Sequence, residues 1–306
     1  MNNQKTRKIK TPVKSQEITR KIFPSEQGKV SHNHSENTQP RRRPCGCIFL
    51  LVILLAFYFL APFRTNVVIL GIDRAPTGTM AGRSDTIMLV SVNPLLPTFK
   101  ALSIPRDLWV SIPGVGENRI NTAHYFAEAS QPGSGPYAAM NAINENFLLN
   151  TRYYLRFNLE NFPGIIDALG GITLDLPQAM AGFPAGRSRL NGEQALAFLR
   201  SRSDGDDFFR MRQGQIFVFS FTREIINPVN WPRIPMVTTA ASSALDTNLP
   251  FYLWPRIGLA LLRSSFSGID MYTIDRSMVV PFVTSEGAQV LLPDWNIIHP
   301  FVRENF

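Results

Sequence analysis

The feature that most constrains this chain is residues 46–63, a run of 18 residues without a charged side chain in a sequence of 306 residues. As a helix this run spans roughly 27 Å, which nearly matches the hydrocarbon core of a bilayer. A buried core helix or a cleavable signal fits less well, because the run is apolar on every side, 45 residues precede it and no small-residue cleavage pattern follows. The sequence therefore predicts one transmembrane helix over residues 46–63.

The charge distribution indicates how that helix is oriented. Residues 1–45 carry eleven Lys or Arg and three acidic residues, which accounts for the whole net charge of +8. Three consecutive arginines directly precede the predicted span, and only Arg64 directly follows it. Because basic residues stay on the cytoplasmic side, we expect residues 1–45 inside the cell and residues 64–306 outside. The neutral exported part lacks a basic field for holding nucleic acid.

The composition of the two flanking parts differs. Residues 1–45 are polar and basic with few apolar side chains, so we expect a disordered cytoplasmic tail. Both cysteines, Cys45 and Cys47, lie at the inner edge of the predicted span, and tolerated small residues are a simpler interpretation of them than lipid attachment sites. The exported part therefore has neither a disulfide framework nor a thiol nucleophile.

The exported part alternates strand-like and helix-like segments. Continuous β-branched and apolar runs at residues 66–70, 87–92 and 99–104 predict central strands covered on both faces. Shorter strands are predicted at residues 172–176, 271–274 and 278–280, and helices at residues 120–128, 137–146, 159–169, 208–226, 234–245 and 249–263. Gly170 ends one helix, and Asn191 with Gln194 forms a capping pattern for a further helix. This mixture predicts an α/β fold, a three-layer α/β/α sandwich with a central mixed sheet.

Arginine and aspartate recur in short segments next to these strands and helices, at residues 71–73, 83–86, 104–107, 200–202 and 206–213. A guanidinium binds phosphate oxygens bidentately and stays charged at any working pH. Two carboxylates from different strand ends, Asp73 and Asp85, suit a hard cation such as Mg²⁺. Taken singly, each residue is more simply a surface or capping residue, and the recurrence of such segments at element ends favours a phosphate site.

The spacing of two of these arginines is informative. Arg200 and Arg202 would point apart on a helix, but they share one face in an extended segment, which favours a paired clamp just past the helix end. No Ser-His-Asp arrangement is legible, because only His124 and His299 lie in the exported part. The chemistry suggested by the residues is therefore phosphate binding.

These segments, in their order and spacing, resemble the LytR-CpsA-Psr family of membrane-anchored bacterial enzymes that attach glycopolymers to the cell wall. The resemblance covers residues 66 to about 226 and rests on residues 67–73, 83–92, 103–107, 119–124, 167–172, 190–196 and 200–202. It implies a catalytic domain over residues 64–306, with a motif-bearing core at 66–226 and a packing region at 227–306. It also implies that the fold buries a polyprenyl chain and holds its pyrophosphate at the mouth.

The resemblance assigns roles position by position. Asp73 and Asp85 correspond to Mg²⁺ ligands and, with Arg83 and Arg106, to the catalytic residues. The pyrophosphate-binding arginines it implies are Arg83, Arg106, Arg119, Arg200, Arg202 and Arg210. One position departs from the family pattern, because Gly214 stands where a glutamine is usual, between Gln213 and Gln215, either of which can replace it after a small shift.

The function implied by the resemblance is phosphoryl transfer. A peptidoglycan hydroxyl would attack the lipid-linked glycan and release polyprenyl phosphate, with Mg²⁺ as cofactor and pyrophosphate hydrolysis as a side activity. The partners expected are a polyprenyl-pyrophosphate-linked glycan, a peptidoglycan acceptor and the bacterial cell membrane. Two alternatives are a non-catalytic sensor of the same lipid and a transcriptional attenuator. Sequence-specific nucleic acid is not expected, because no helix-turn-helix or similar reading element is legible.

The predicted topology can be tested with a protease added to intact cells or protoplasts. We expect digestion of the chain after residue 64 and protection of residues 1–45, because the charge bias before the span retains the tail inside. Antibodies to each end would follow the fragments by immunoblot. A protected carboxyl end would overturn the orientation.

Overall fold

The computed structural model describes residues 45–60, 63–73, 75–76, 79–93, 98–201, 207–267 and 269–306. The chain divides into two units, Met1–Gly46 and Cys47–Phe306, and the elements below belong to the second, apart from the start of α1 (Cys45–Leu60). The tail predicted over residues 1–45 lies outside the described residues except for Cys45. In the part of the chain described here, no helix combines the length and the apolar character needed to traverse a bilayer. The span predicted at residues 46–63 therefore stays a prediction.

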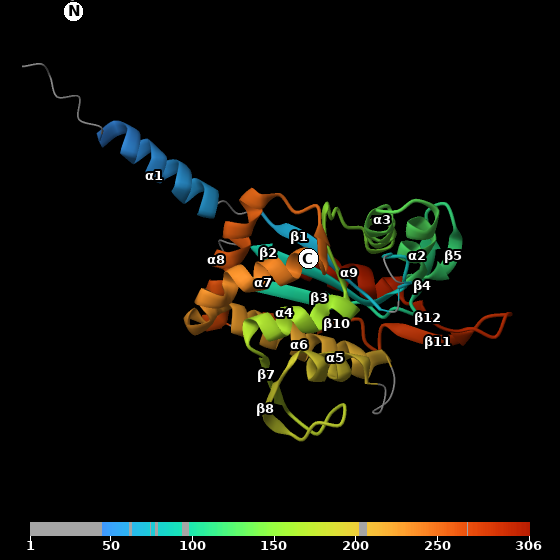
Figure 1. Ribbon diagram of the computed structural model, residues 1–306. Coiled ribbons are helices and arrows are strands. Elements are labelled where there is room, and N and C mark those ends of the chain that lie inside the picture. The colour runs from blue at the N-terminus through green and yellow to red at the C-terminus, as the bar shows by residue number, and fades with distance from the viewer. Residues whose placement is uncertain are drawn as a thin grey trace, which may run out of the picture. The chain divides into compact units, whose positions relative to one another are not determined.

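A six-stranded mixed sheet forms the centre of the fold (Figure 1). Its strands, in spatial order, are β10 (Ile269–Thr273), β3 (Thr98–Ser103), β2 (Ser84–Asn93), β1 (Thr65–Ile72), β6 (Tyr153–Asn158) and β9 (Leu245–Thr247). The pairs β1–β2, β2–β3 and β6–β9 are antiparallel, and β1–β6 and β3–β10 are parallel. The mixed sheet predicted from the sequence is confirmed.

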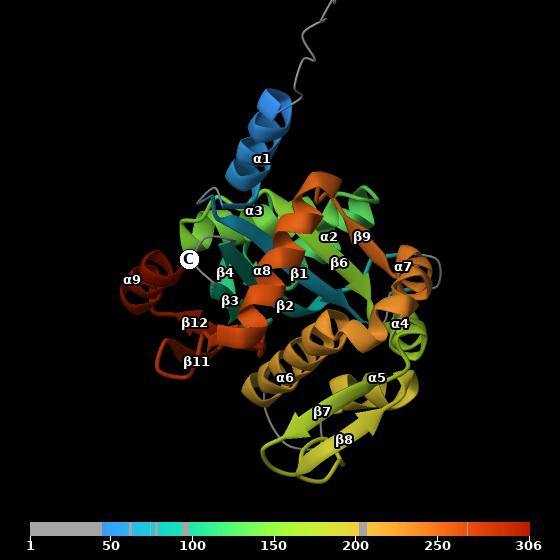
Figure 2. The ribbon, with the colours of Figure 1, turned by 90° about the vertical axis from the view of Figure 1, so that its left-hand side faces the viewer.

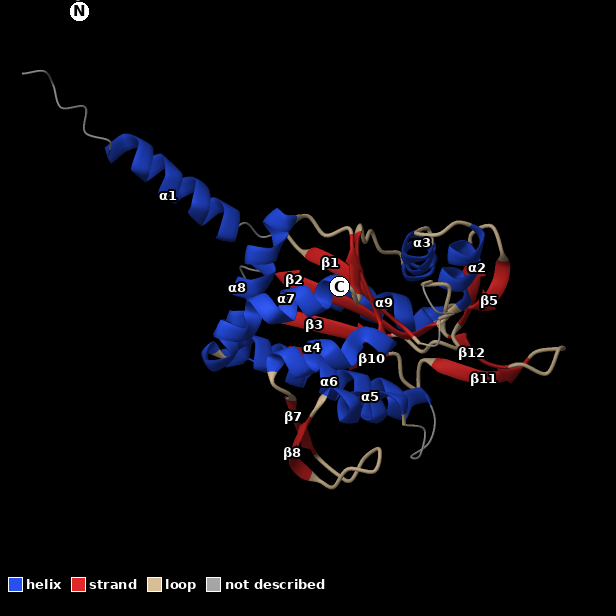
Figure 3. Ribbon diagram, viewed as in Figure 1, coloured by secondary structure: helices blue, strands red, loops and turns tan. Residues whose placement is uncertain are grey.

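The central strands are buried on both faces, as their continuous apolar sequences predict. In β2, Ile87 and Leu89 pack into the cluster that contains residues of α3 and α9, whereas Met88 and Val90 pack on the opposite side with Ala260 of α8. Successive side chains of a strand point to opposite faces, so such a strand needs cover on both sides. This requirement produces three layers (Figure 3).

Helices of two groups supply those layers. One group is α2 (Thr122–Ser130), α3 (Gly135–Phe147) and α9 (Trp295–Asn305). The other group is α4 (Phe162–Leu169), α5 (Gly192–Arg200), α6 (Asp207–Ile226), α7 (Ile234–Ser242) and α8 (Trp254–Ser267). Short 3₁₀ helices η1 (Leu159–Asn161), η2 (Pro228–Arg233) and η3 (Phe251–Leu253) lead into α4, α7 and α8.

Three two-stranded hairpins complete the fold. They are β4 (Trp109–Ile112) with β5 (Gly116–Arg119), β7 (Ile172–Leu176) with β8 (Gly186–Leu190), and β11 (Val279–Val283) with β12 (Gln289–Pro293). Figure 2 shows β7 and β8 on the side of α5 and α6 that faces away from the central sheet. There they form a second apolar cluster with α4, α5, α6 and α7.

Local sequence signals set the ends of the helices that matter for the site. The Asn191 side chain accepts a hydrogen bond from the Gln194 amide at 2.9 Å, and the Gln194 side chain accepts one from the Asn191 amide at 3.0 Å. This reciprocal capping box starts α5, as predicted. Gly170 ends α4 in the left-handed conformation, with φ of 86°.

The region after α6 does more than pack around the core, because it supplies both edge strands of the central sheet. The helix predicted over residues 234–245 ends at Ser242, and Leu245 belongs to β9. Strand β6 carries Arg156 in its buried interior, which breaks the apolar pattern that reveals strands. Its guanidinium is neutralised by Glu128 at 2.9 Å and Asp246 at 2.6 Å.

The second cluster supports a stability prediction at Phe198, which is fully buried in α5. We expect Phe198→Ala to lower the free energy of unfolding by about 3–5 kcal/mol, from lost apolar burial and the cavity left behind. Urea unfolding of the full chain measures this loss. Phe251→Ala is the matched control, because Phe251 is 85% exposed and its truncation should change stability by less than about 0.5 kcal/mol. Equal effects of the two substitutions would contradict the packing described.

Candidate functional site

The antiparallel pairing of β1, β2 and β3 brings three chain segments to one edge of the sheet. Ile72 at the end of β1 pairs with Ser84 at the start of β2, and Ser103 at the end of β3 pairs with Met88. An antiparallel neighbour starts where its partner ends, so the residues after β1 and β3 lie beside the beginning of β2. Asp73, Asp85 and Arg106 therefore meet, although they are far apart in sequence.

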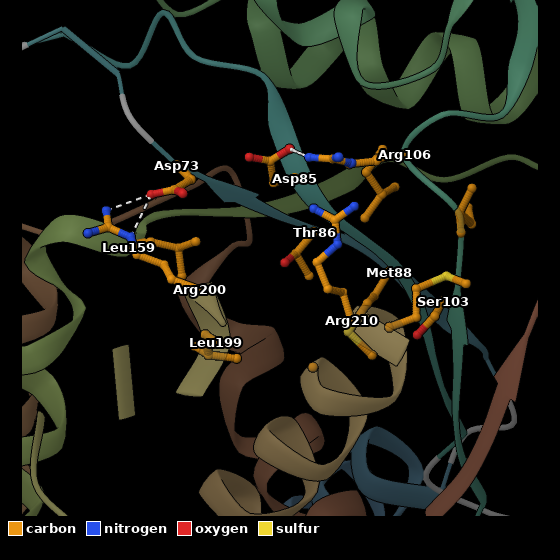
Figure 4. A pocket seen from close by; sticks show the side chains of 14 residues that line it. Asp73, Asp85, Thr86, Met88, Ser103, Arg106, Leu159, Leu199, Arg200 and Arg210 are labelled. Atoms are coloured by element: carbon orange, nitrogen blue, oxygen red, sulfur yellow. Dashed lines mark hydrogen bonds and ion pairs between the residues drawn. The ribbon is translucent and has the colours of Figure 1, made fainter. Parts of the chain in front are cut away.

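These residues line a cavity of about 770 Å³, counting the part that opens to solvent (Figure 4). The lining is completed by α5, α6 and η1. The full set is Asp73, Asp85, Thr86, Ile87, Met88, Ser103, Ile104, Arg106, Leu159, Leu199, Arg200, Arg210, Met211 and Gly214. Five of the lining residues carry charge, and most of the others are apolar.

The most buried charged group in the cavity is Asp73, whose side chain is 8% exposed. Arg200, the last residue of α5, donates to Asp73 Oδ1 from Nε at 2.9 Å and from Nη2 at 2.5 Å. A carboxylate removed from water needs such a partner, because its charge is otherwise strongly destabilising. The contact fixes the end of α5 against the end of β1.

A second ion pair lies beside the first. Arg106 Nη1 donates to Asp85 Oδ1 at 2.6 Å, and Arg106 Nε lies 3.4 Å from Asp107 Oδ2. Arg210 extends from α6 toward Asp85 and Arg106 (Figure 4). Three guanidinium groups thus share the cavity with two carboxylates, and a planar guanidinium binds an anion such as phosphate bidentately.

Two of the arginines predicted for the site are described by the structure but do not line this cavity. Arg83 directly precedes β2, and its side chain is exposed. Arg119 ends β5, where its Nε lies 3.2 Å from Asp107 Oδ1 and its Nη2 donates to the Gln289 carbonyl at 2.8 Å. Arg202 lies outside the described residues.

Gly214 lines the cavity, and neither neighbouring glutamine is among the lining residues. Gln213 is buried and donates to the Phe198 carbonyl at 3.2 Å. Gln215 donates to the Tyr272 carbonyl and to Thr273 Oγ1, each at 2.8 Å, and to Ser103 Oγ at 3.2 Å. Neither side chain therefore takes the place of a glutamine at position 214, and the wall of the cavity has only glycine there.

The apolar side of the cavity was not predicted residue by residue. Ile87 and Met88 come from β2, Ile104 follows β3, and Leu199 and Met211 come from α5 and α6. Their only sequence signal is the continuous apolar character of the strands and helices, which is equally typical of core residues. The lining combines charged side chains with apolar ones, which suits an anionic group attached to a hydrocarbon.

The donor chemistry of the site fits a magnesium ion that shares its coordination with a substrate. Within the described ranges, no group of three or more His, Cys, Asp or Glu side chains could hold a metal ion. Mg²⁺ commonly uses only one or two protein carboxylates and takes its other ligands from phosphates and water. Asp73 and Asp85, which line the same cavity, match that pattern.

Comparisons with known sequences agree with one another. A family model, the LytR_cpsA_psr family, matches residues 55–293. A protein of Oceanobacillus iheyensis named "Polyisoprenyl-teichoic acid--peptidoglycan teichoic acid transferase TagU" is 40% identical over 158 residues, covering 49% of this chain and 48% of that protein. The "Regulatory protein MsrR" of Staphylococcus aureus is 28% identical over 195 residues, covering 61% of this chain and 57% of that protein. The chain thus spans about half the length of the curated relatives it matches.

Solved structures share the fold. The structure described as "Crystal structure of B. subtilis TagV" superposes with a TM-score of 0.63 at 23% identity, covering 80% of this chain and 97% of that chain. The structure described as "TagT bound to LIIa-WTA" gives a TM-score of 0.63 at 21% identity, covering 79% of this chain and 89% of that chain. At these identities the likeness concerns the architecture, which is the mixed α/β sandwich described above.

Proposed function

This chain belongs to the LytR_cpsA_psr family, and from that premise we propose that it is a transferase that moves a glycopolymer from a polyprenyl-pyrophosphate carrier to a hydroxyl of peptidoglycan. The name of the relative from Oceanobacillus iheyensis, a teichoic acid transferase that acts on peptidoglycan, supports this class of reaction. The enzyme is a phosphotransferase, and hydrolysis of the pyrophosphate is its side activity when water replaces the acceptor.

The observation that carries the proposal is the composition of the cavity. Its lining combines Arg106, Arg200 and Arg210 with two aspartates and several apolar side chains. A polyprenyl pyrophosphate combines the matching features, two linked phosphates and a hydrocarbon chain. Guanidinium groups hold phosphate oxygens in a planar, bidentate geometry, so they select the pyrophosphate rather than any anion of the same charge.

Binding of the pyrophosphate requires the ion pairs to change partners. Arg200 binds Asp73 and Arg106 binds Asp85 in the structure, and phosphate oxygens compete with these carboxylates for the same donors. Each arginine that turns to phosphate leaves a carboxylate without its partner. Asp73 and Asp85 would then hold Mg²⁺, which when bound neutralises charge on the pyrophosphate oxygens.

The transfer itself is a displacement at phosphorus. The acceptor hydroxyl oxygen bonds to the phosphorus nearest the glycan, the bond from that phosphorus to the bridging oxygen breaks, and polyprenyl phosphate leaves with the bridging oxygen. The hydroxyl proton must pass to a base, and Asp73 or Asp85 can take it only where that carboxylate is not fully committed to the metal. Arg106, Arg200 and Arg210 stabilise the charge that accumulates on the leaving phosphate, because they are held in place before the reaction starts.

The location that we propose is the bacterial cell membrane, with one span over residues 46–63 and the catalytic domain outside. The uncharged run of 18 residues and the basic residues before it support this topology. A span directly before β1, which begins at Thr65, would tether the catalytic domain to the membrane that holds a lipid carrier.

The metal proposal predicts the effect of removing one carboxylate charge. We expect Asp73→Asn and Asp85→Asn each to lower Mg²⁺-dependent release of polyprenyl phosphate by on the order of a hundredfold, since positioning and charge neutralisation are both lost. Asp175→Asn is the control, because Asp175 is exposed on β7 outside the cavity. Full activity of both cavity variants, or full wild-type activity in EDTA, would refute the metal site.

A second prediction distinguishes an enzyme from a sensor that only binds the lipid. Arg200→Lys keeps the charge but loses the planar fork, so turnover should fall more than lipid binding does. The assay uses the purified full chain, lipid-linked glycan, Mg²⁺ and peptidoglycan, and measures binding and transfer separately. Arg187→Lys on β8, where the side chain is exposed, should match wild type. Wild-type protein that binds the lipid but never turns it over, with acceptor or with water, would favour the sensor.

A further inference from the structure

His124 of α2 is a fully buried residue that the transfer reaction does not use directly. Its Nδ1 lies 2.9 Å from the Gly82 carbonyl oxygen, and its Nε2 lies 3.2 Å from Arg156 Nη1. A guanidinium only donates and a carbonyl only accepts, so the two contacts assign one tautomer. The ring is neutral, donates from Nδ1 to Gly82 and accepts at Nε2 from Arg156.

On the side away from Gly82, the His124 ring contacts Arg156, which is itself held by two carboxylates. Arg156 forms ion pairs with Glu128 at 2.9 Å and with Asp246 at 2.6 Å. Glu128 also accepts the backbone amides of Gly133 and Gly135 at 3.0 and 2.9 Å. Burial lowers the pKa of His124, and the charge of Arg156 acts in the same direction against the Gly82 hydrogen bond and the two carboxylates. His124 is thus a rigid neutral donor.

Gly82 is confined from the opposite side by the end of β1. A Cβ at Gly82 would lie 2.7 Å from Ile72 Cγ2 and 3.1 Å from the Asp73 carbonyl oxygen, so the glycine backbone packs directly against this strand end. The His124 hydrogen bond therefore holds Gly82 against the residue that carries the most buried carboxylate of the cavity. Gly82 is also three residues before Asp85.

The turn that carries His124 reaches the other side of the cavity as well. The Asn121 carbonyl lies 3.5 Å from both the amide and the hydroxyl of Ser84, and the Asn121 amide donates to the Arg106 carbonyl at 3.3 Å. Residues 121–124 thus contact the backbone at three points, next to Asp73, next to Asp85 and at Arg106. None of these contacts is made by a side chain that lines the cavity. Arg106 lines the cavity, but only its backbone carbonyl takes part here.

We propose that His124 is a positioning residue for the transfer site, which holds Gly82 so that Asp73 and Asp85 keep their relative placement in the cavity. The proposal rests on the proposed transferase function for its catalytic consequence, and on geometry alone for the structural one. A displacement of about 1 Å in such a site costs on the order of a hundredfold in rate. His124 acts through Gly82 and does not touch the substrate.

Two substitutions separate the positioning contact from simple core packing. In His124→Asn, the side-chain amide nitrogen replaces Nδ1 and can still donate to Gly82, while the contact with Arg156 is lost. In His124→Gln, the longer amide replaces Nε2 and can still accept from Arg156, while the Gly82 contact is lost. A residue that only fills space would lose function in proportion to lost stability in both variants.

The first readout is hydrogen exchange of the ligand-free full chain, which needs no activity. We expect His124→Gln to raise amide exchange at residues 79–86 and His124→Asn to leave it near wild type, with exchange in β7 and β8 unchanged in both. Gly82→Ala tests the next link, the packing of Gly82 against the end of β1, and should raise exchange at residues 79–86 even if a His124 variant fails to fold. Equal exchange in the two His124 variants, or no change in Gly82→Ala, would overturn the positioning role.

The second readout is transfer with lipid-linked glycan. We expect His124→Gln to lower kcat by ~10- to 100-fold with little change in KM, and His124→Asn to stay within about threefold of wild type. Parallel losses of kcat in both variants would overturn the proposal. If wild type itself does not turn over while exchange changes as expected, the transferase function is wrong and the His124 contact stands.

Discussion

The structure depends on the antiparallel pairing of β1 with β2 and of β2 with β3. These strands are buried on both faces, so their interiors carry mostly apolar side chains. The functional groups therefore lie at the sheet edge, where the end of β1, the start of β2 and the end of β3 come together. Helices α5 and α6 close this edge into a cavity by contributing Arg200 and Arg210.

The two aspartates enclosed in this cavity are each paired with an arginine. The Asp73 side chain is 8% exposed and pairs with Arg200, and Asp85 pairs with Arg106. An anion alone would separate the arginines from their carboxylates, and a cation alone would be repelled by the arginines that hold those carboxylates. Binding of pyrophosphate and of a divalent cation is therefore expected to be mutually favourable, because each compensates the charge that the other leaves exposed.

A second charged network supports the site from the other face of the sheet. Arg156 in β6 is satisfied by Glu128 and Asp246, and its remaining contact orients His124. Such a buried network is stable only when every member has a partner, so it holds its neighbours in a single arrangement. Through Gly82 that arrangement reaches the end of β1, which connects the packing of α2 to the geometry of the aspartates.

The sequence by itself determined the features that arise from local signals. Continuous apolar runs marked β1, β2 and β3, the capping box marked the start of α5, and recurring Arg and Asp segments led to Asp73, Asp85, Arg106, Arg200 and Arg210. Only the tertiary structure decided the features that depend on distant partners. Strand β6 was hidden because its buried Arg156 is tolerated only beside Glu128 and Asp246, which the chain brings in from α2 and β9. Arg119 lies beside Asp107 instead of in the cavity, and Gln215 faces the end of β10, because the pairing of remote strands, and not spacing along the chain, determines which side chains meet.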